Sequence, residues 1–309
     1  MNGSSARWTA WGQHFAIAAA YAGCYEVARH MNFSDWTLTA GLRLACLLLV
    51  PVKYWPALAV GETVPLVVNA LFCMSTLGGP WALSASVPMI VLFMGCVKPV
   101  LQRWPLRGQD GRVRMPVVIV VAFGCAAITA VSTSVTLATA LSYAPMAWPG
   151  ISVGACFWVY LLGAYLIALT LPPAILTLHE RSQALKRLTW RVVWRSGLLR
   201  DAALWAFPGL VISAWLAHVA PDNTIRQLAR MAMLLPVLGL AFRHGWHGSA
   251  IGGFGASIAL AVTGTVSFDP AMIESQVVLA LVISGVLLAG TRAPCAFSAA
   301  PCQEHRRFE

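Results

Sequence analysis

Charged residues are scarce in this sequence. Only 10% of the 309 residues are charged, and Asp and Glu together number 11 against 21 Lys and Arg. Hydrophobic residues make up 59%, and the mean hydropathy is +0.72. A typical soluble domain is about half apolar and about one quarter charged. The composition therefore excludes an ordinary soluble globular protein.

The residue patterns of common active sites are also missing. The eight cysteines form no CxxC pair, and no Cys/His spacing is typical of a zinc site. The polar segments contain no glycine-rich phosphate loop, no Ser/His/Asp arrangement and no paired acids. We therefore expect no catalytic activity, no metal and no cofactor.

Apolar segments of about 18 to 22 residues recur along the whole chain, which is the length a helix needs to cross a bilayer. Strands of a membrane barrel would instead alternate polar and apolar residues over about 10 positions. The sequence predicts an all-α integral membrane protein, a polytopic bundle of about ten (8 to 10) transmembrane helices. The predicted spans are 12–31, 36–52, 55–76, 79–97, 115–140, 150–173, 202–220, 228–243, 248–267 and 273–291.

The eighth predicted span is the weakest. Only twelve residues separate Arg230 from Arg243, so this segment must tilt little, borrow residues from Ile225 onward, or stop short of crossing. A count of nine spans is therefore also open.

The basic residues indicate the orientation. With ten spans and a cytoplasmic amino terminus, all but four of the Lys and Arg residues are cytoplasmic, as the positive-inside rule predicts. The exceptions are Arg29, Arg43, Arg226 and Arg230. The predicted organisation is a cytoplasmic segment 1–11, a membrane domain 12–292 with cytoplasmic loops at about 98–114 and 176–201, and a cytoplasmic tail 293–309.

This orientation also accounts for the net charge and indicates how a signal would leave the protein. Basic loops facing anionic lipid explain the charge of +10, so we expect the lipid bilayer and no nucleic acid as a partner. The tail after Arg292 is shorter than the roughly 50 residues of a small domain, so we expect output through a separate protein.

Three ionisable residues lie inside the first three predicted spans. Glu26, Arg43 and Glu62 sit about 21, 15 and 10 Å from the inner edge, at about 1.5 Å per residue. A charge at the bilayer centre costs roughly 2.5–3.5 kcal/mol, so such residues usually find partners. Two interpretations are open: a site in which Arg43 holds an anionic or carbonyl-bearing ligand, or a structural ion pair that fixes helix packing.

Two further polar stretches have competing interpretations. The hydroxyl residues between Thr129 and Ser142 line one span, where helix packing is favoured over a polar cavity. The stretch from His179 to Asp201 repeats Arg187, Arg191 and Arg195, which predicts an amphipathic helix on the inner leaflet or a docking surface.

One block of sequence resembles the first family of bacterial membrane-associated sensor domains. It runs from Thr39-Ala40-Gly41-Leu42-Arg43-Leu44-Ala45 to Lys53-Tyr54-Trp55-Pro56-Ala57. The family has an Ala-Gly-Leu motif opening a leucine-rich span, followed by a basic-aromatic-Trp-Pro turn. The matching positions are Ala40, Gly41, Leu42, Tyr54, Trp55 and Pro56. The stretches 162–173 and 235–248 resemble the family in character.

The resemblance implies a function. Such domains are usually input modules of histidine kinases and cyclic-di-GMP enzymes, so it implies a bacterial inner-membrane sensor. This sensor would bind a small ligand or membrane partner and signal through a separate cytoplasmic kinase or cyclic-di-GMP enzyme. A homo-oligomer is compatible with this interpretation. The alternative is a small-solute transporter or permease, for which the polar residues at mid-depth would line an anion path.

Overall fold

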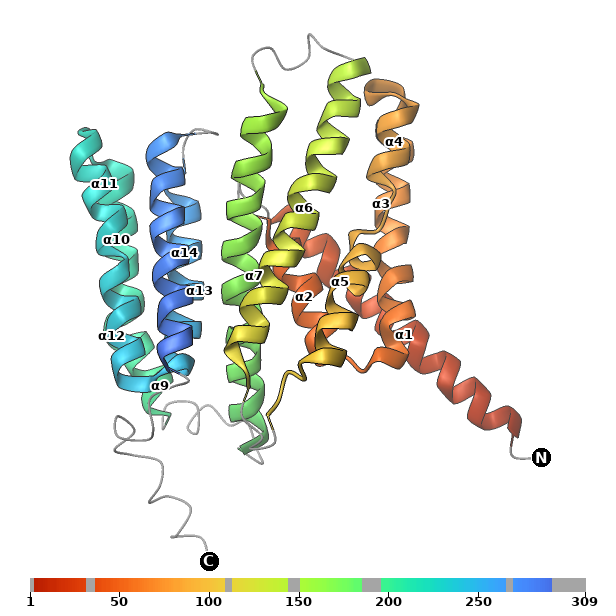
Figure 1. Ribbon diagram of the computed structural model, residues 1–309, viewed down its shortest axis with the longest axis horizontal. Coiled ribbons are helices and arrows are strands. Elements are labelled where there is room, and N and C mark those ends of the chain that lie inside the picture. The colour runs from red at the N-terminus through yellow and green to blue at the C-terminus, as the bar shows by residue number, and fades with distance from the viewer. Residues whose placement is uncertain are drawn as a thin grey trace, which may run out of the picture. The chain divides into compact units, whose positions relative to one another are not determined.

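The computed structural model describes residues 3–31, 37–108, 113–143, 151–184, 196–264 and 269–290. Within these ranges the secondary structure is helical, apart from one isolated bridge between Arg107 and Val113 (Figure 1). The elements are α1 Gly3–His30, α2 Leu38–Leu49, η1 Val52–Tyr54, α3 Trp55–Leu77, α4 Gly79–Ala85, α5 Met89–Arg103, α6 Met115–Tyr143, α7 Val153–Ala184, α9 Gly197–Asp201, η3 Ala202–Ala206 (a π-helical turn), α10 Phe207–Val219, α11 Asn223–Ala232, α12 Leu234–His244, α13 Trp246–Val262 and α14 Pro270–Gly290.

The prediction of an all-α multi-pass membrane protein is confirmed. Seven helical segments in the described part are long and apolar enough to cross a membrane: Val52–Leu77, Gly79–Arg103, Met115–Tyr143, Val153–Glu180, Gly197–Val219, Asn223–His244 and Pro270–Gly290. The other predicted spans coincide with α1, with the 12-residue apolar α2 and with the 17-residue α13. Whether these three also cross determines the total, so the range of 8 to 10 stays a prediction.

The eighth span begins earlier than the predicted residue 228 and is therefore longer than predicted. The continuous segment begins at Asn223, where the side chain of Asp222 accepts a hydrogen bond of 3.1 Å from the amide of Thr224. Arg230 therefore lies within the segment, and its side chain is buried and paired with Asp269 at 3.1 Å. Of the three options for this span, the structure has the one in which residues are borrowed at the amino-terminal side.

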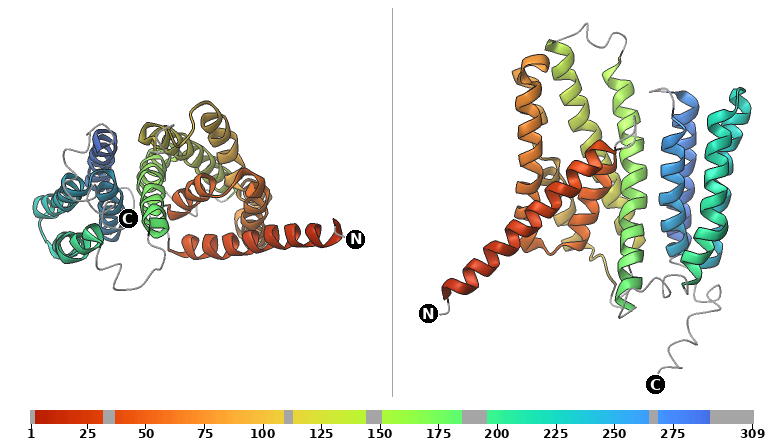
Figure 2. Two further views of the ribbon diagram at one scale, coloured as in Figure 1. Left: turned by 90° about the horizontal axis from the view of Figure 1, so that it is seen from below. Right: turned by 180° about the vertical axis from the view of Figure 1, so that it is seen from behind.

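The chain divides into two compact units. Unit 1 comprises Met1–Trp104 and Val121–Ala168, and unit 2 comprises Pro105–Val120 and Leu169–Glu309, so α6 and α7 each contribute to both. In unit 1, α3 packs against α1, α4 and α5, while α2 packs against α1 and α5. Figure 2 shows α1, in red, running obliquely to the other helices of this unit.

The predicted span 79–97 consists of two helices. Proline has no amide hydrogen and disfavours a helical conformation at the residue before it. Pro88 accordingly separates α4, which ends at Ala85, from α5, which begins at Met89. The break leaves the first amides of α5 without partners inside the helix, and one of them is used at the site described below.

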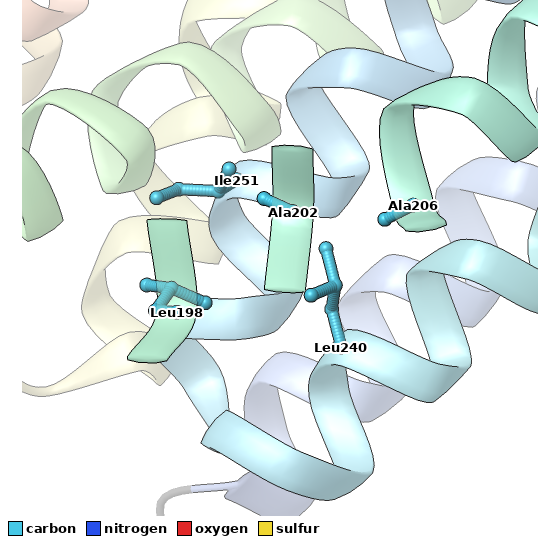
Figure 3. Packing of buried hydrophobic residues seen from close by; sticks show 5 residues of the cluster. All are labelled: Leu198, Ala202, Ala206, Leu240 and Ile251. Atoms are coloured by element: carbon cyan, nitrogen blue, oxygen red, sulfur yellow. The ribbon is translucent and has the colours of Figure 1, made fainter. Parts of the chain in front are cut away.

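In unit 2, a single residue joins two packed helices. Gly245 has φ +62° and ψ −143°, a combination that residues with a side chain rarely adopt, and it separates α12 from α13. Leu198, Ala202 and Ala206 pack with Leu240 of α12 and Ile251 of α13 (Figure 3). The small residues of the π-helical turn allow this close packing.

The hydroxyl residues of α6 support the packing interpretation. Thr129 donates to the carbonyl of Cys125 at 2.9 Å, and Thr136 donates to that of Ser132 at 3.0 Å. Thr139 is within 3.2 Å of the hydroxyl of Ser84 on α4. These three hydroxyls bond their own helix or a neighbouring one, whereas the buried hydroxyl of Ser134 has no hydrogen-bond partner among the described residues. Of the predicted amphipathic stretch, residues 185–195 lie outside the described residues.

The crossing of α1 and α3 generates a prediction about stability. A Cβ at Gly61 would lie 2.5 Å from the backbone carbonyl oxygen of Ala18, so the two helices approach too closely for any side chain there. We expect Gly61→Ala to destabilise the protein by about 1–3 kcal/mol, measured as a lower thermal midpoint in detergent micelles.

Gly95→Ala is the matched control, because a Cβ there has no atom within 4 Å. This variant should be neutral or slightly stabilising, since alanine favours a helix over glycine. Equal midpoints for the two variants would contradict the close crossing.

Candidate functional site

Arg43 of α2 and Glu62 of α3 form a buried ion pair. The Nε atom of Arg43 donates to both carboxylate oxygens of Glu62, at 3.1 Å each. The side chain of Arg43 is 3% exposed and that of Glu62 is fully buried. Leaving water costs each ion several kcal/mol, roughly, so the pair persists only with good geometry and further hydrogen bonds.

The carboxylate of Glu62 receives these further bonds from two other helices. The hydroxyl of Tyr21 on α1 donates to Oε2 at 2.9 Å. The amide of Ile90 in the first turn of α5 donates to Oε1 at 3.3 Å. This amide is free because Pro88 starts a new helix, and the amino-terminal end of a helix favours a negative charge. Groups from four helices, α1, α2, α3 and α5, therefore meet at one carboxylate.

The guanidinium of Arg43 is also enclosed by its surroundings. Its Nη2 donates to the hydroxyl of Tyr25 at 3.3 Å, and its Nη1 donates to the hydroxyl of Thr39 at 3.4 Å. The ring centroids of Tyr25 and Phe93 lie 5.3 and 5.9 Å from its Cζ atom, within the range of cation–π attraction. The cation is thus held by polar atoms at its edge and by aromatic faces.

Glu26, the third predicted site residue, is not part of this cluster. It pairs with Arg29 on the same helix at 2.7 Å, and the two side chains are 38% and 32% exposed. Tyr21 and Tyr25 are four residues apart and share the face of α1 that contacts the ion pair. Glu26 is rotated by about 100° from Tyr25 and lies off that face. Arg43 therefore has one acidic partner here and does not bridge two.

Sequence reasoning did not assign Tyr21, Tyr25, Thr39 or the amide of Ile90 to the site. The signal for the tyrosines was their spacing of four residues within an apolar span. Thr39 stands four residues before Arg43 and so lies on the same face of α2. No sequence signal singles out Ile90, because its backbone amide, and not its side chain, binds Glu62.

The family-like motif shapes the connection between the two charged helices. Ala40 and Gly41 are buried on α2, and Leu42 is half-buried. Trp55 is buried at the start of α3, where its Nε1 donates to the carbonyl of Val50 at 3.1 Å. Pro56 occupies the first turn of α3, where a missing amide costs nothing.

Tyr54 ties the same connection to α1. Its hydroxyl donates to the side-chain oxygen of Gln13 at 2.9 Å, and the ammonium of Lys53 lies 4.6 Å from its ring centroid. Tyr54, Trp55 and Pro56 lie at the turn, whereas Ala40, Gly41 and Leu42 lie on α2 directly before Arg43. Their role in the structure is to set how α2 and α3 stand, and hence how Arg43 meets Glu62.

The charged groups at this site are buried and engage one another. No group of three or more His, Cys, Asp or Glu side chains in the described residues could hold a metal ion. The cluster is suited to fixing helix positions and to responding when those positions change.

The burial of the pair generates a second prediction. Arg43→Met leaves a buried carboxylate without its cation, and Glu62→Met leaves the cation unpaired, so each should cost about 3–5 kcal/mol. The double variant removes both charges and should cost less than the sum of the two. The measurement is a double-mutant cycle on thermal or denaturant unfolding in micelles.

The exposed pair on α1 is the matched control for this cycle. Glu26→Gln and Arg29→Gln should each cost less than the Arg43 and Glu62 variants, because these two side chains are only partly buried and pair within one helix. Additive losses for the Arg43 and Glu62 variants would contradict the direct coupling.

Comparison with known proteins agrees with the geometry. The family model of the MASE1 membrane-associated sensor domain matches residues 12–292, nearly the whole chain. No curated protein and no solved structure matches the chain. The matched range contains the Arg43–Glu62 cluster and the α2–α3 connection on which the resemblance rests. The chain therefore belongs to the MASE1 family of membrane-associated sensor domains.

Proposed function

We propose that the protein is a sensory input subunit of the bacterial inner membrane. It binds a small ligand or a membrane partner and signals through a separate cytoplasmic output protein, a histidine kinase or a cyclic-di-GMP enzyme. It has no catalytic activity of its own. The membership of residues 12–292 in a sensor-domain family supports the sensory role. The observation that carries the mechanism is the junction of four helices at the Glu62 carboxylate.

The junction provides a physical means of responding to a stimulus. A ligand shifts a conformational equilibrium only by the difference in its affinity for the two states. Moving α2 against α3 stretches the Arg43–Glu62 bonds, and moving α1 or α5 removes a donor from Glu62. Each displacement weakens bonds to the same buried charge, so the four helices are expected to move together.

The proposed sensor can be distinguished from a transporter by whether water has to reach the carboxylate of Glu62. In a transporter, the carboxylate would have to be reached from water during the cycle. In the structure Glu62 is fully buried, and both of its oxygens accept hydrogen bonds. This favours a role in helix arrangement. Anion flux into proteoliposomes that collapses with Glu62→Gln would instead support transport.

The proposed orientation places both termini in the cytoplasm, and the positive-inside distribution of Lys and Arg supports it. We expect a green fluorescent protein fused after Glu309 to fluoresce and an alkaline phosphatase fused there to be inactive. An active phosphatase fusion would overturn the orientation and, with it, a cytoplasmic output protein.

The output protein can be sought by affinity purification. The tagged full-length protein would be isolated from its own membranes after mild crosslinking, and the recovered proteins identified by mass spectrometry. We expect enrichment of a histidine kinase or a cyclic-di-GMP enzyme, whose activity would then be assayed in the same membranes. Recovery of the protein alone would count against a separate output subunit.

Substitutions at the junction then test the mechanism. Tyr21→Phe removes one donor to Glu62 and little else, so we expect at least a threefold change in partner activity with unchanged membrane levels. Arg43→Ala should abolish the response. Tyr143→Phe is the matched control, because Tyr143 is an exposed tyrosine at the end of α6 and contributes no donor to Glu62. Loss of activity only in proportion to loss of protein would show that the pair is structural.

A further inference from the structure

A second set of ion pairs in unit 2 converges on the turn between α12 and α13. The turn presents Arg243, His244 and His247 on either side of Gly245. These side chains contact two carboxylates from elsewhere in the chain, Asp201 of α9 and Glu180 of α7. We refer to Arg243, His244 and His247 with Asp201 and Glu180 as the turn clamp.

The first half of the turn clamp holds α9. Nη1 of Arg243 lies 2.9 Å from Oδ2 of Asp201, and Nε2 of His244 lies 3.0 Å from the same oxygen. The side chain of Arg243 is 62% exposed, whereas those of His244 and Asp201 are 18% and 12% exposed. The histidine is therefore the better shielded of the two cationic partners, and its contact is less screened by solvent.

The second half holds the end of α7. Nε2 of His247 lies 3.5 Å from Oε2 of Glu180, and Nη2 of Arg107 lies 3.3 Å from Oε1. The ring of Trp246 stacks on that of His247 with centroids 3.8 Å apart. Each carboxylate thus has one arginine and one histidine as partners.

The two carboxylates bracket a strongly basic stretch of sequence. Glu180 precedes it and Asp201 follows it, and the residues between them include six Lys and Arg: Arg181, Lys186, Arg187, Arg191, Arg195 and Arg200. One short turn therefore holds the helix that leads into this stretch and the helix that leads out of it.

We propose that the turn clamp is a proton-dependent tether on the ends of α7 and α9. Histidine is the side chain whose charge ordinarily changes between pH 5 and 8, whereas arginine stays charged throughout. A hydrogen bond with two ionised partners is roughly twice as strong as a neutral one. The tether is strongest with protonated histidines and weakens when they lose their protons at higher pH, while the arginines keep a residual attachment.

The charged groups around both histidines support a tether that is stronger when the histidines are protonated. His244 faces Asp201 from α9, with Arg243 on the same oxygen and Gly197 of α9 beside its ring. His247 faces Glu180 from α7, with Arg107 on the opposite oxygen. The neighbouring His179 and Arg200 stand next to the two carboxylates in sequence and add positive charge when protonated. Each carboxylate remains the nearest opposite charge, so protonation of its histidine strengthens the contact.

This inference does not depend on the proposed sensory function, because it concerns a conformational property of the protein alone. The test is hydrogen–deuterium exchange of the full-length protein in nanodiscs at pH 6 and pH 8, corrected for the chemical pH dependence of exchange. We expect amides of residues 176–184 and 197–206 to exchange on the order of fivefold faster at pH 8. Amides of α14 serve as the internal reference.

Single variants separate the two halves. His244→Gln should remove the pH dependence at residues 197–206 and leave that at 176–184, and His247→Gln should do the reverse. His218→Gln, an exposed histidine of α10, is the matched control and should change neither. The same pH dependence in the two clamp variants as in the control would overturn the proposal, as would its absence from the unmodified protein.

The carboxylates provide a further check that does not touch the histidines. Asp201→Asn should give fast exchange at 197–206 at both pH values, because the acceptor has lost its charge. Glu180→Gln should do the same at 176–184. Slow, pH-dependent exchange in these variants would show that the pH effect arises elsewhere and would overturn the tether.

Discussion

A carboxylate in the middle of a membrane domain has to be surrounded by donors, and this requirement organises unit 1. Glu62 is fully buried and is satisfied by Arg43, by the hydroxyl of Tyr21 and by the amide of Ile90. Taking the charge out of water is unfavourable, so these donors must be placed together and kept there. The positions of α1, α2, α3 and α5 are therefore linked through one side chain.

Several local features of the sequence serve this arrangement. Pro88 interrupts a helix and frees the amide that binds Glu62. Gly61, one residue before Glu62, lets α1 approach closely enough for Tyr21 to reach the carboxylate. Trp55 fixes the turn between the two charged helices. Of the block by which the family is recognised, Arg43 thus forms the ion pair itself, while Trp55 and Pro56 lie at the turn between the two charged helices.

The ion pairs of unit 2 follow a different principle. In the turn clamp each carboxylate is shared between an exposed arginine and a better-shielded histidine, so solvent and protons reach part of it. The Arg43–Glu62 pair is buried, and its partners among the described residues are the hydroxyls of Tyr21, Tyr25 and Thr39 and the amide of Ile90. A deeply buried pair is suited to linking helices tightly, whereas a partly exposed one can respond to the conditions at the membrane surface.

From the sequence alone follow the membrane class, most of the apolar segments and the three candidate charges, because hydrophobic length and the cost of an intramembrane charge are local properties. The sequence also indicated the family through the α2–α3 connection. Only the tertiary structure decided that Glu62, and not Glu26, is the partner of Arg43, since this depends on which face of α1 meets α3. The tertiary structure also brought in Tyr21 and the amide of Ile90, and it joined Glu180 and Asp201 to one turn. These contacts link residues far apart in the chain, and no local pattern encodes a contact that packing alone creates.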